Sequence, residues 1–245
     1  MKILLTNDDG IHAEGINTLY TVLSREHDVY MFAPHEEKSA CSNALSIWNS
    51  IRVDFCDTKR FAVYGYPADC VNIGIHSELC PDIDLVVSGI NHGPNLGDDI
   101  HYSGTVAGAR SGLIFGKHSI AVSINTHSLS ENLVECSEYV LSFIDTHPIL
   151  NFPDPVCTNI NYPDLPADRI AGVKLTRQGR RSYIDTYSII DRSSLHVTFQ
   201  LKGDVISDFT EDTDTGEITR NYITLTPLQL DSTNHTVLQQ LSDEK

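Results

Sequence analysis

KILLTNDDG, at residues 2–10, runs from a short apolar segment directly into two adjacent carboxylates, Asp8 and Asp9. The apolar part predicts a buried strand, and Gly10 allows the backbone to turn sharply after it. Burying two carboxylates at the end of a strand is unfavourable unless a cation binds them, so the turn is a candidate metal site. The next segment shows the i, i+3, i+4 spacing of a helix, with apolar residues at Ile16, Leu19, Tyr20 and Leu23.

Two more apolar runs end in polar loops. Residues 27–33 and 84–88 are typical of strands, and the loops that follow them contain Ser39 and Asn91. If these strands are parallel neighbours of the first, their carboxyl ends lie at one edge of the sheet, where open α/β folds bind ligands. We therefore expect Ser39 and Asn91 to converge with the carboxylates of the first turn.

The expected cluster offers only oxygen ligands: two carboxylates, a hydroxyl and an amide carbonyl. An all-oxygen set with room for water suits Mg²⁺ or Mn²⁺ better than Zn²⁺. Taken alone, an Asp-Asp-Gly turn is a weak signal, because Asp8 or Asp9 could instead cap the following helix. Ser39 and Asn91 could likewise be ordinary turn residues.

A second polar stretch, residues 95–109, passes from a glycine-bearing loop into a helix rich in small residues. Ser103, Gly104 and Thr105 stand at the predicted helix start, where backbone amides and hydroxyls commonly bind phosphate. An ordinary Ser/Thr cap would explain the same residues. A P-loop and a Gly-x-Gly-x-x-Gly turn are absent, which argues against a nucleoside triphosphatase or a dinucleotide oxidoreductase. No Gly-x-Ser-x-Gly elbow is present either.

The charge balance is strongly acidic, with 17 basic against 33 acidic residues and a formal net charge of −16. Such a surface repels nucleic acid polymers, whose binding depends on neutralisation of phosphates by Lys and Arg. A small phosphate ligand would need local attraction from a cation and from backbone amides. The charge therefore favours small anions over long duplexes as ligands.

The 245 residues are 40% apolar, which is enough for one large α/β domain or for a domain with an appendage. No stretch approaches the roughly 20 apolar residues of a membrane span, and the start lacks the layout of a signal peptide. We expect a soluble, cytoplasmic protein that is not bound to a membrane. The six cysteines form no Cys-x-x-Cys pair and are expected to be reduced and mostly buried; they are Cys41, Cys56, Cys70, Cys80, Cys136 and Cys157.

Strands and helices alternate up to about residue 150, which predicts a catalytic α/β domain over residues 1–150. Residues 151–245 carry proline-punctuated strands and a short terminal helix. Period-2 alternation over residues 183–189 predicts a half-exposed hairpin. Because this extension has little core of its own, we expect it to pack on a second subunit. Further helices are predicted after Pro67 and over residues 129–144.

These motifs together resemble the survival protein SurE family of metal-dependent 5′/3′-nucleotidases. The resemblance covers roughly residues 1–125, and the order and spacing of its motifs are far more specific than any one of them. The motifs are NDDG at 7–10, Ser39, GYPADC at 65–70, SGIN at 88–91, NLG at 95–97 and YSGTV at 102–106.

The resemblance implies a Rossmann-like parallel-sheet domain with an extended C-terminal β-arm exchanged between the subunits of a homodimer or homotetramer. It implies hydrolysis of nucleoside 5′- and 3′-monophosphates to nucleoside and phosphate, in some members also of short polyphosphate. Asp8 or Asp9 would orient the attacking water or accept its proton. The implied ligands of one divalent ion per subunit are Asp8, Asp9, Ser39 and Asn91, and the implied phosphate pocket comprises Asn95, Ser103, Gly104 and Thr105.

Several positions depart from the family pattern and leave substrate preference and the packing of the arm open; they are Glu36, Tyr66, Ser111 and Asn221. Two other classes of function are compatible with the same motifs. One is a metal-dependent nucleotide sensor without turnover, and the other is a purely structural oligomer. The full set of oxygen ligands beside a Ser-Gly-Thr loop favours the enzyme, because binding alone needs fewer of them.

Overall fold

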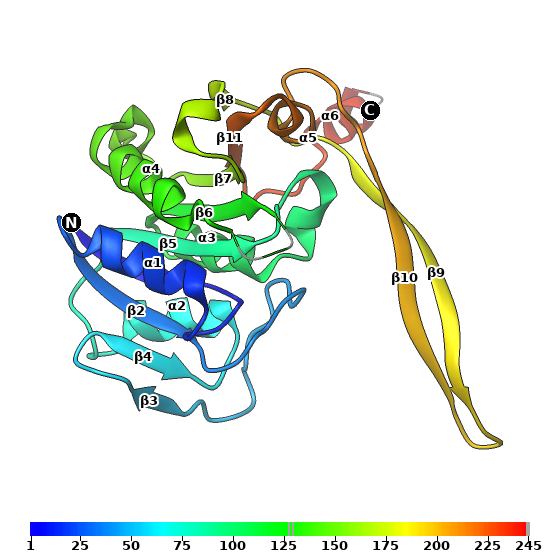
Figure 1. Cartoon of the computed structure of the whole chain (residues 1–245), viewed down its shortest axis with the longest axis horizontal. Helices are drawn as coiled ribbons and strands as arrows, with labels where there is room; N and C mark the ends of the chain where they lie inside the picture. Colours follow the sequence, from blue (N-terminus) through cyan, green and yellow to red (C-terminus); the bar gives the residue numbers. More distant parts are fainter. Residues whose placement is uncertain (127, 129, 244–245) are drawn as a thin grey trace.

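The computed structural model describes residues 1–126, 128 and 130–243. A large twisted β-sheet lies at its centre, helices cover both faces of the sheet, and a long two-stranded arm projects from one side (Figure 1). Within the described residues, no helix is both long enough and apolar enough to cross a bilayer.

The central sheet has nine strands among the described residues, in the order β3-β4-β2-β1-β5-β6-β7-β11-β8. Their apolar residues are largely buried, as expected for a sheet covered on both faces. The strands are β1 (Lys2–Thr6), β2 (Asp28–Pro34), β3 (Val53–Phe55), β4 (Arg60–Val63), β5 (Leu85–His92), β6 (His118–Asn125), β7 (Cys157–Pro163), β8 (Gly172–Leu175) and β11 (Tyr222–Leu228).

The first strand, β1, pairs in parallel with β2 on one side and with β5 on the other. This confirms that the three predicted strands are parallel neighbours. Because parallel strands point the same way, the polar loops that follow them all leave the sheet at one edge. The structure thus confirms the predicted α/β fold with a mostly parallel sheet.

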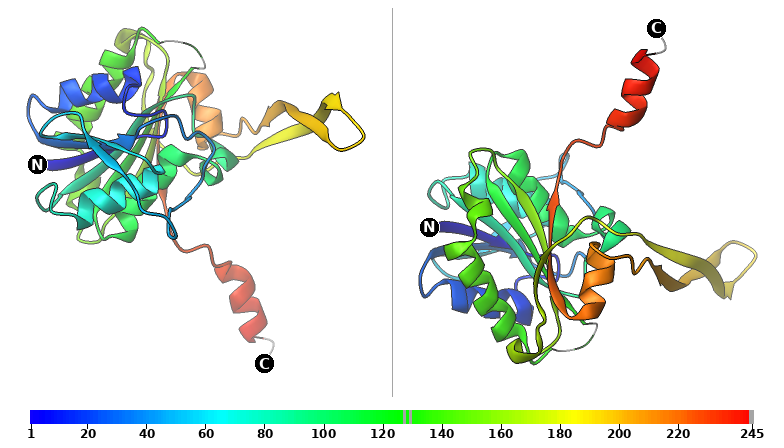
Figure 2. Two further views of the ribbon diagram at one scale, coloured as in Figure 1. Left: turned by 90° about the horizontal axis from the view of Figure 1, so that it is seen from below. Right: turned by 90° about the horizontal axis from the view of Figure 1, so that it is seen from above.

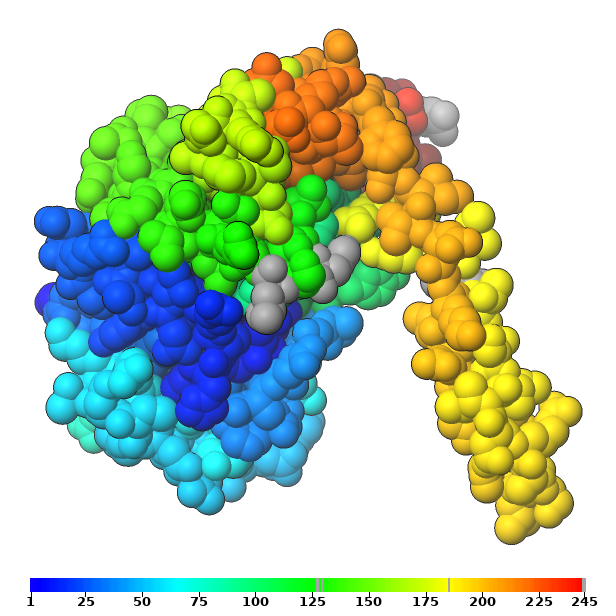
Figure 3. Space-filling view, viewed as in Figure 1, coloured from blue at the N-terminus to red at the C-terminus, as the bar shows by residue number. Residues whose placement is uncertain are grey.

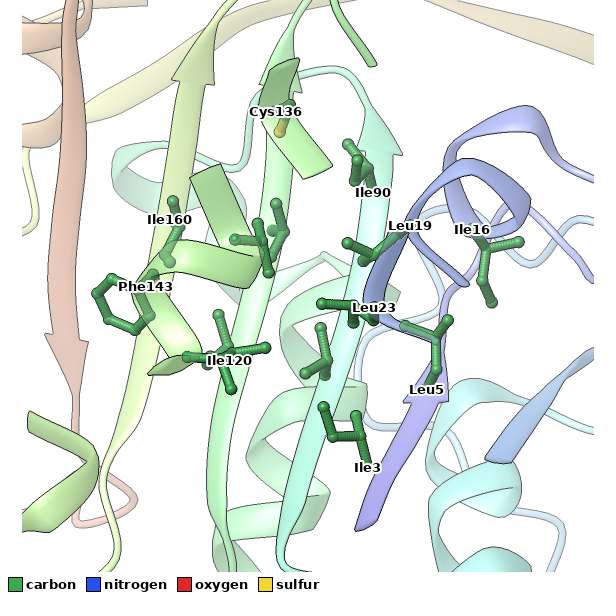
Figure 4. Packing of buried hydrophobic residues seen from close by; sticks show 14 of the residues in the cluster. Ile3, Leu5, Ile16, Leu19, Leu23, Ile90, Ile120, Cys136, Phe143 and Ile160 are labelled. Atoms are coloured by element: carbon green, nitrogen blue, oxygen red, sulfur yellow. The ribbon is translucent and has the colours of Figure 1, made fainter. Parts of the chain in front are cut away.

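Helices α1 (Glu14–Leu23) and α4 (Leu133–Thr146) pack together on one face of the sheet. Their apolar sides meet the strands in the main hydrophobic cluster, where Leu19, Leu23 and Phe143 lie against β-strand isoleucines and leucines (Figure 4). Helices α2 (Pro67–His76) and α3 (Gly104–Ile114) pack together and contact the sheet as well. Their apolar residues belong to two other clusters, so the four helices divide between the two faces.

The chain after residue 150 contributes to two places. Strands β7, β11 and β8 extend the central sheet beyond β6, with β11 antiparallel to β7. Strands β9 (Arg181–Arg192) and β10 (Val197–Ser207) form the arm, which is the predicted hairpin in a longer form. The terminal helix α6 (His235–Asp243) lies away from the body of the molecule (Figure 2). Short helical segments complete the chain: η1 (Gly97–His101), η2 (Pro148–Asn151), η3 (Ala167–Arg169), α5 (Asp214–Glu217) and η4 (Ile218–Arg220).

One predicted helix boundary was wrong. The pattern predicted a helix over residues 129–144, whereas α4 begins at Leu133; Leu129 lies outside the described residues. Ser130 and Asn132 both donate hydrogen bonds to Asp164, which fixes the segment before α4 as a turn. All six cysteines are free thiols in the structure; three are buried, two are intermediate and Cys56 is exposed, so fewer are buried than predicted.

Candidate active site

The two carboxylates of the first turn lie at the end of β1 and differ in burial and in hydrogen-bond partners. Asp8 is only 4% exposed and accepts a hydrogen bond from the Thr105 hydroxyl. Asp9 is partly buried and accepts a hydrogen bond of 3.3 Å from the backbone N–H of His92, at the end of β5. Burial raises the pKa of Asp8 to about 6, and the neighbouring charge of Asp9 adds to the shift. Burial likewise raises the pKa of Asp9 to about 6.

These carboxylates do not cap the helix that follows them. The N-cap of α1 is Ala13, and no side chain caps it. The alternative interpretation of Asp8 and Asp9 as ordinary helix caps was therefore wrong. The turn instead places two buried or half-buried acids side by side at the edge of the sheet.

No lysine or arginine of the described chain forms an ion pair with Asp8 or Asp9, and the nearest basic atom is His92 Nδ1, at 3.9 Å from Asp9 Oδ2. The described residues also contain no cluster of three or more His, Cys, Asp or Glu side chains arranged to hold a metal. A cation here would therefore need neutral oxygens besides the two acids. Unpaired buried acids with hydroxyl and amide oxygens nearby fit a hard divalent ion and do not fit a zinc site.

The neutral oxygens come from the loops after β2 and β5. Ser39 is exposed and its hydroxyl donates to Glu37 Oε1 at 2.8 Å. Asn91 donates from Nδ2 to the Gly93 carbonyl at 2.7 Å, which leaves its Oδ1 as the amide atom for a ligand. Asp8, Ser39 and Asn91 line one pocket with a cavity volume of about 580 Å³. The structure thus brings together side chains from three separate loops.

The same pocket is lined by two of the residues predicted to bind phosphate, Asn95 and Ser103. Asn95 is buried, and its side chain donates to Ser123 Oγ at 2.7 Å while its backbone N–H donates to Asn161 Oδ1 at 2.8 Å. Its carbonyl accepts from the Asn159 side chain at 2.8 Å. Side chains of strands β6 and β7 therefore fix the position of the loop that carries Asn95.

Ser103 is the N-cap of α3, because its hydroxyl accepts from the Val106 backbone N–H at 3.0 Å. The helix-cap interpretation is therefore correct for this residue, and it does not conflict with ligand binding. The side chain uses its oxygen as a cap, and its residue lines the pocket at the N-terminal end of α3, where the first N–H groups of a helix have no partner within the helix.

Gly104 and Thr105 are buried beside Asp8, and neither belongs to the lining of the pocket. A Cβ atom on Gly104 would come within 2.8 Å of the Asp8 side chain, so glycine permits the close approach of α3 to the turn after β1. Thr105 reaches the site through its hydrogen bond to Asp8. Its hydroxyl stabilises the charged form of that carboxylate.

The GYPADC motif supports the loop that contains Ser39. Asp69 is buried and accepts from the backbone N–H of Ser46 at 2.9 Å, from the Ser46 hydroxyl at 2.8 Å and from the Tyr66 backbone N–H at 2.9 Å. These three bonds tie residues after Ser39 to the start of α2. The role of Asp69 is therefore to hold the loop in position.

Sequence reasoning missed the part of the pocket that comes from the arm. Arg181, Tyr183 and Leu201 line the same cavity, although they belong to β9 and β10. The alternation over residues 183–189 indicated only a hairpin, and it carries no information about which loop the hairpin root contacts. That contact depends on the path of the chain, which brings the start of β9 against Asp98 and Asp99 of η1.

Comparison with known proteins gives a consistent result. The chain matches the family described as "Survival protein SurE" over residues 3–185. It is 44% identical to the 5′-nucleotidase SurE of Leptospira interrogans, over 99% of this chain and 97% of the relative. It is 41% identical to the 5′-nucleotidase SurE of Pseudoalteromonas atlantica, over 98% of this chain and 97% of that protein.

A solved structure agrees with these sequences. The crystal structure of the SurE protein from Aquifex aeolicus superposes with a TM-score of 0.84 at 34% sequence identity, covering 98% of each chain. The similarity therefore includes the arm and the C-terminal strands as well as the residues that carry the motifs. This chain belongs to the survival protein SurE family.

Proposed function

We propose that this chain is a divalent-metal-dependent phosphomonoesterase that hydrolyses nucleoside 5′- and 3′-monophosphates to nucleoside and phosphate. Short polyphosphate is a further proposed substrate. The observation that carries the proposal is that one pocket is lined both by Asp8, which forms no ion pair with a basic side chain of the described residues, and by Ser103, the N-cap of α3. The relatives named 5′-nucleotidase support the choice of nucleotides as substrates.

The proposed cofactor is one Mg²⁺ or Mn²⁺ ion per subunit. When bound, such an ion polarises phosphoryl oxygens and lowers the pKa of a water molecule. The donor set described above consists of hard oxygens, which this class of ion prefers. The residues proposed to hold the ion are Asp8, Asp9, Ser39 and Asn91.

The phosphate of the substrate is proposed to lie against the start of α3. There the first turn of α3 presents partial positive charge to an anion; Gly104 and Thr105 belong to this turn and lie behind the pocket lining, beside Asp8. Asn95 and the Ser103 hydroxyl supply further hydrogen-bonding groups in the pocket lining. Such fixed donors meet the charge that builds on phosphoryl oxygens during transfer, which is commonly a dominant contribution to catalysis.

Asp8 and Asp9 are the proposed catalytic residues, because they orient the attacking water or accept its proton. Thr105 is a positioning residue in this scheme, since it acts through the Asp8 carboxylate. The hydrogen bond from His92 to Asp9 has the same effect on the second carboxylate. Both acids are thus held by strands and a helix rather than by a free loop, which favours fixed geometry.

The proposal extends to the organisation of the protein. Residues 1–150 form the catalytic part, and residues 151–245 contain the oligomerisation arm of a homodimer or homotetramer. The arm carries exposed apolar side chains on both strands, which supports a cover from a second subunit. The free cysteines support the cytoplasm as the compartment.

Phosphate release from AMP tests the proposal. The purified chain is assayed with Mg²⁺, with Mn²⁺ and with EDTA, and we expect release with the metals and none with the chelator. Asp9→Asn should abolish release under all three conditions. The matched control is Asp82→Asn, which removes a carboxylate that is 91% exposed and lies before β5, at the opposite edge of the sheet. Equal rates with metal and with EDTA would contradict the proposal.

A further inference from the structure

The pocket is larger than a phosphate site requires. Asp8, Ser39 and Asn91 line it from the loops of the body, Arg181 and Tyr183 line it from the root of the arm, and Leu201 lines it from farther along β10. Its volume of about 580 Å³ falls in the range of sites that enclose whole small molecules. A phosphate bound against the loops of the body therefore leaves room for the group esterified to it on the arm side. Figure 3 shows the arm continuing outward from the body beyond this point.

The arm root is fixed relative to the phosphate side of the pocket. Tyr183 donates its hydroxyl hydrogen bond to Asp99 Oδ1 at 2.7 Å, and Arg181 Nη1 lies 2.9 Å from Asp99 Oδ2. The Arg181 backbone N–H also donates to Asp98 Oδ2 at 3.0 Å. Asp98 and Asp99 belong to η1, which leads directly to Ser103 at the start of α3.

A second set of contacts holds the same two segments together. The buried Asp214 carboxylate accepts from the Gly97 backbone N–H at 3.0 Å and from the Gly179 backbone N–H at 2.7 Å. Gly97 has a φ of +53°, and a Cβ atom there would lie 2.9 Å from the Arg181 backbone nitrogen. The loop before η1 and the strand β9 are therefore packed backbone against backbone, and the Tyr183 ring has a defined position.

The chemistry of the arm side differs from that of the residues near Asp8. Arg181 is the one lysine or arginine among the residues described as lining the pocket, and its charge is paired with Asp99. Tyr183 and Leu201 also line the pocket from the arm, and Tyr102 lines it from the loop between η1 and α3. A paired charge with aromatic and aliphatic surface suits a flat uncharged group, and poorly suits a second phosphate.

We infer that the root of the arm forms the nucleoside subsite, and that Tyr183 is a specificity-determining residue that packs against the base of the substrate. This inference rests on the proposed function. It adds that the arm side of the pocket contacts the nucleoside, while the residues near Asp8 contact the phosphate. Every nucleobase has a π face, so an aromatic side chain can stack on any base. Such a residue distinguishes nucleotides from phosphoesters without a base, and does not select one base over another. Asp99 is then a positioning residue, because it orients both Tyr183 and Arg181.

A pair of substrates that differ only in the base tests the inference. AMP and ribose 5-phosphate share the sugar and the phosphoester, so the ratio of their kcat/KM values reports recognition of the base. We expect Tyr183→Ala to lower this ratio about tenfold, mainly through the KM for AMP, which corresponds to the loss of one stacking contact. Tyr183→Phe keeps the ring and should lose less than the alanine variant.

The matched control is Ile184→Ala. Ile184 follows Tyr183 on the same strand, so its side chain lies on the opposite face of the ribbon; it is 56% exposed and does not line the pocket, so its loss tests general damage to the arm. We expect this variant to keep the wild-type ratio. An equal fall for AMP and ribose 5-phosphate in Tyr183→Ala, or an unchanged ratio, would overturn the inference.

Binding of adenosine gives a second readout that depends on neither metal nor turnover. Calorimetric titration of the wild-type chain with adenosine should show binding that Tyr183→Ala weakens about tenfold. Absence of adenosine binding to the wild type, or equal binding to the variant, would contradict the nucleoside subsite. Adenosine binding without hydrolysis of any phosphomonoester would instead contradict the proposed function and leave the subsite supported.

Discussion

The acidic edge of the sheet and the β-arm depart from the usual distribution of side chains in opposite directions. At the edge, Asp8 is almost fully removed from solvent, and within the part of the chain that the structure describes it has no ion pair with a cationic side chain. On the arm, large apolar side chains lie in solvent, with Tyr187 66% exposed and Leu195 93% exposed. The first arrangement is unfavourable because of desolvation, and the second because of exposed apolar surface.

The comparison shows that each region is incomplete for a different reason. A cation would offset the buried charge at the edge, whereas a second subunit would remove the apolar surface of the arm from water. Residues that break a local rule without a partner in the chain are where function is expected. The two regions meet at the root of the arm, where Tyr183 and Asp99 join β9 to the loop beside the phosphate site.

The largest effect is expected from removing the charge at the acidic edge. Asp9→Asn should lower phosphate release from AMP at least about a hundredfold, because the variant loses a carboxylate that would bind the cation and accept the proton of the attacking water. The fold should survive, since Asp9 is only partly buried and makes few contacts. Phosphate-release assays over a metal titration measure the loss of activity, and a far-ultraviolet circular dichroism spectrum checks that the fold survives. If Asp9→Asn keeps wild-type turnover at a defined Mg²⁺ concentration, the catalytic site does not lie at the acidic edge.

A charge placed on the apolar surface of the arm tests the role of the arm independently of the acidic edge. Ile190 is 60% exposed, and Ile190→Asp should raise the subunit dissociation constant at least about tenfold by burying an unpaired charge at the interface. Light scattering coupled to size exclusion measures the assembly. Thr58→Asp adds the same charge at an exposed turn of the body, between β3 and β4, and serves as the control. If both variants assemble as the wild type does, the arm is not the interface.

A smaller effect is expected from the residue that supports Asp8. Thr105→Val replaces the hydroxyl that donates to Asp8 by a methyl group of similar size. We expect kcat to fall about tenfold while metal affinity changes less, because the variant disturbs the orientation of one carboxylate and leaves all proposed ligands in place. Steady-state kinetics and a metal titration separate the two effects. Unchanged kinetics would show that the hydroxyl has no part in the site.

The smallest effect concerns stability in EDTA. Burial raises the pKa of Asp9 to about 6, above the unfolded value of about 4, so the native state binds more protons between these values. This contribution is present below about pH 4 and is lost as the pH rises through about 6. Asp9→Asn should therefore gain stability over the wild type as pH rises, on the order of 1–2 kcal/mol.

Urea unfolding in EDTA between pH 4.5 and 7.5 measures that difference. Asp82→Asn is the control with the opposite sign, because the hydrogen bond from Lys117 lowers the pKa of Asp82. Its substitution should give no gain with pH. A stability difference between Asp9→Asn and wild type that does not change with pH would show that Asp9 is not destabilised by burial.

Much of the sheet could be predicted from the sequence. Residues 2–10 combine an apolar run, two acids and a glycine, and such a local pattern predicts both a strand and the place where it ends. The helix α4 could be predicted in position but not in its first residue, because Asp164, far along the chain, holds the preceding turn. Ser103 was open between cap and ligand, since both uses need a hydroxyl at a helix start.

The sequence by itself determined the alternating strands and helices, the edge of the sheet where the polar loops gather, and the exposed hairpin. Periodicity and residue type report local conformation and burial, which is why these features are visible without coordinates. Only the tertiary structure decided that Asp8 and Asp9 do not cap α1, that Thr105 supports Asp8, and that the arm root lines the pocket. These contacts join segments far apart in the chain, and their formation depends on strand order and backbone packing, which no local pattern encodes.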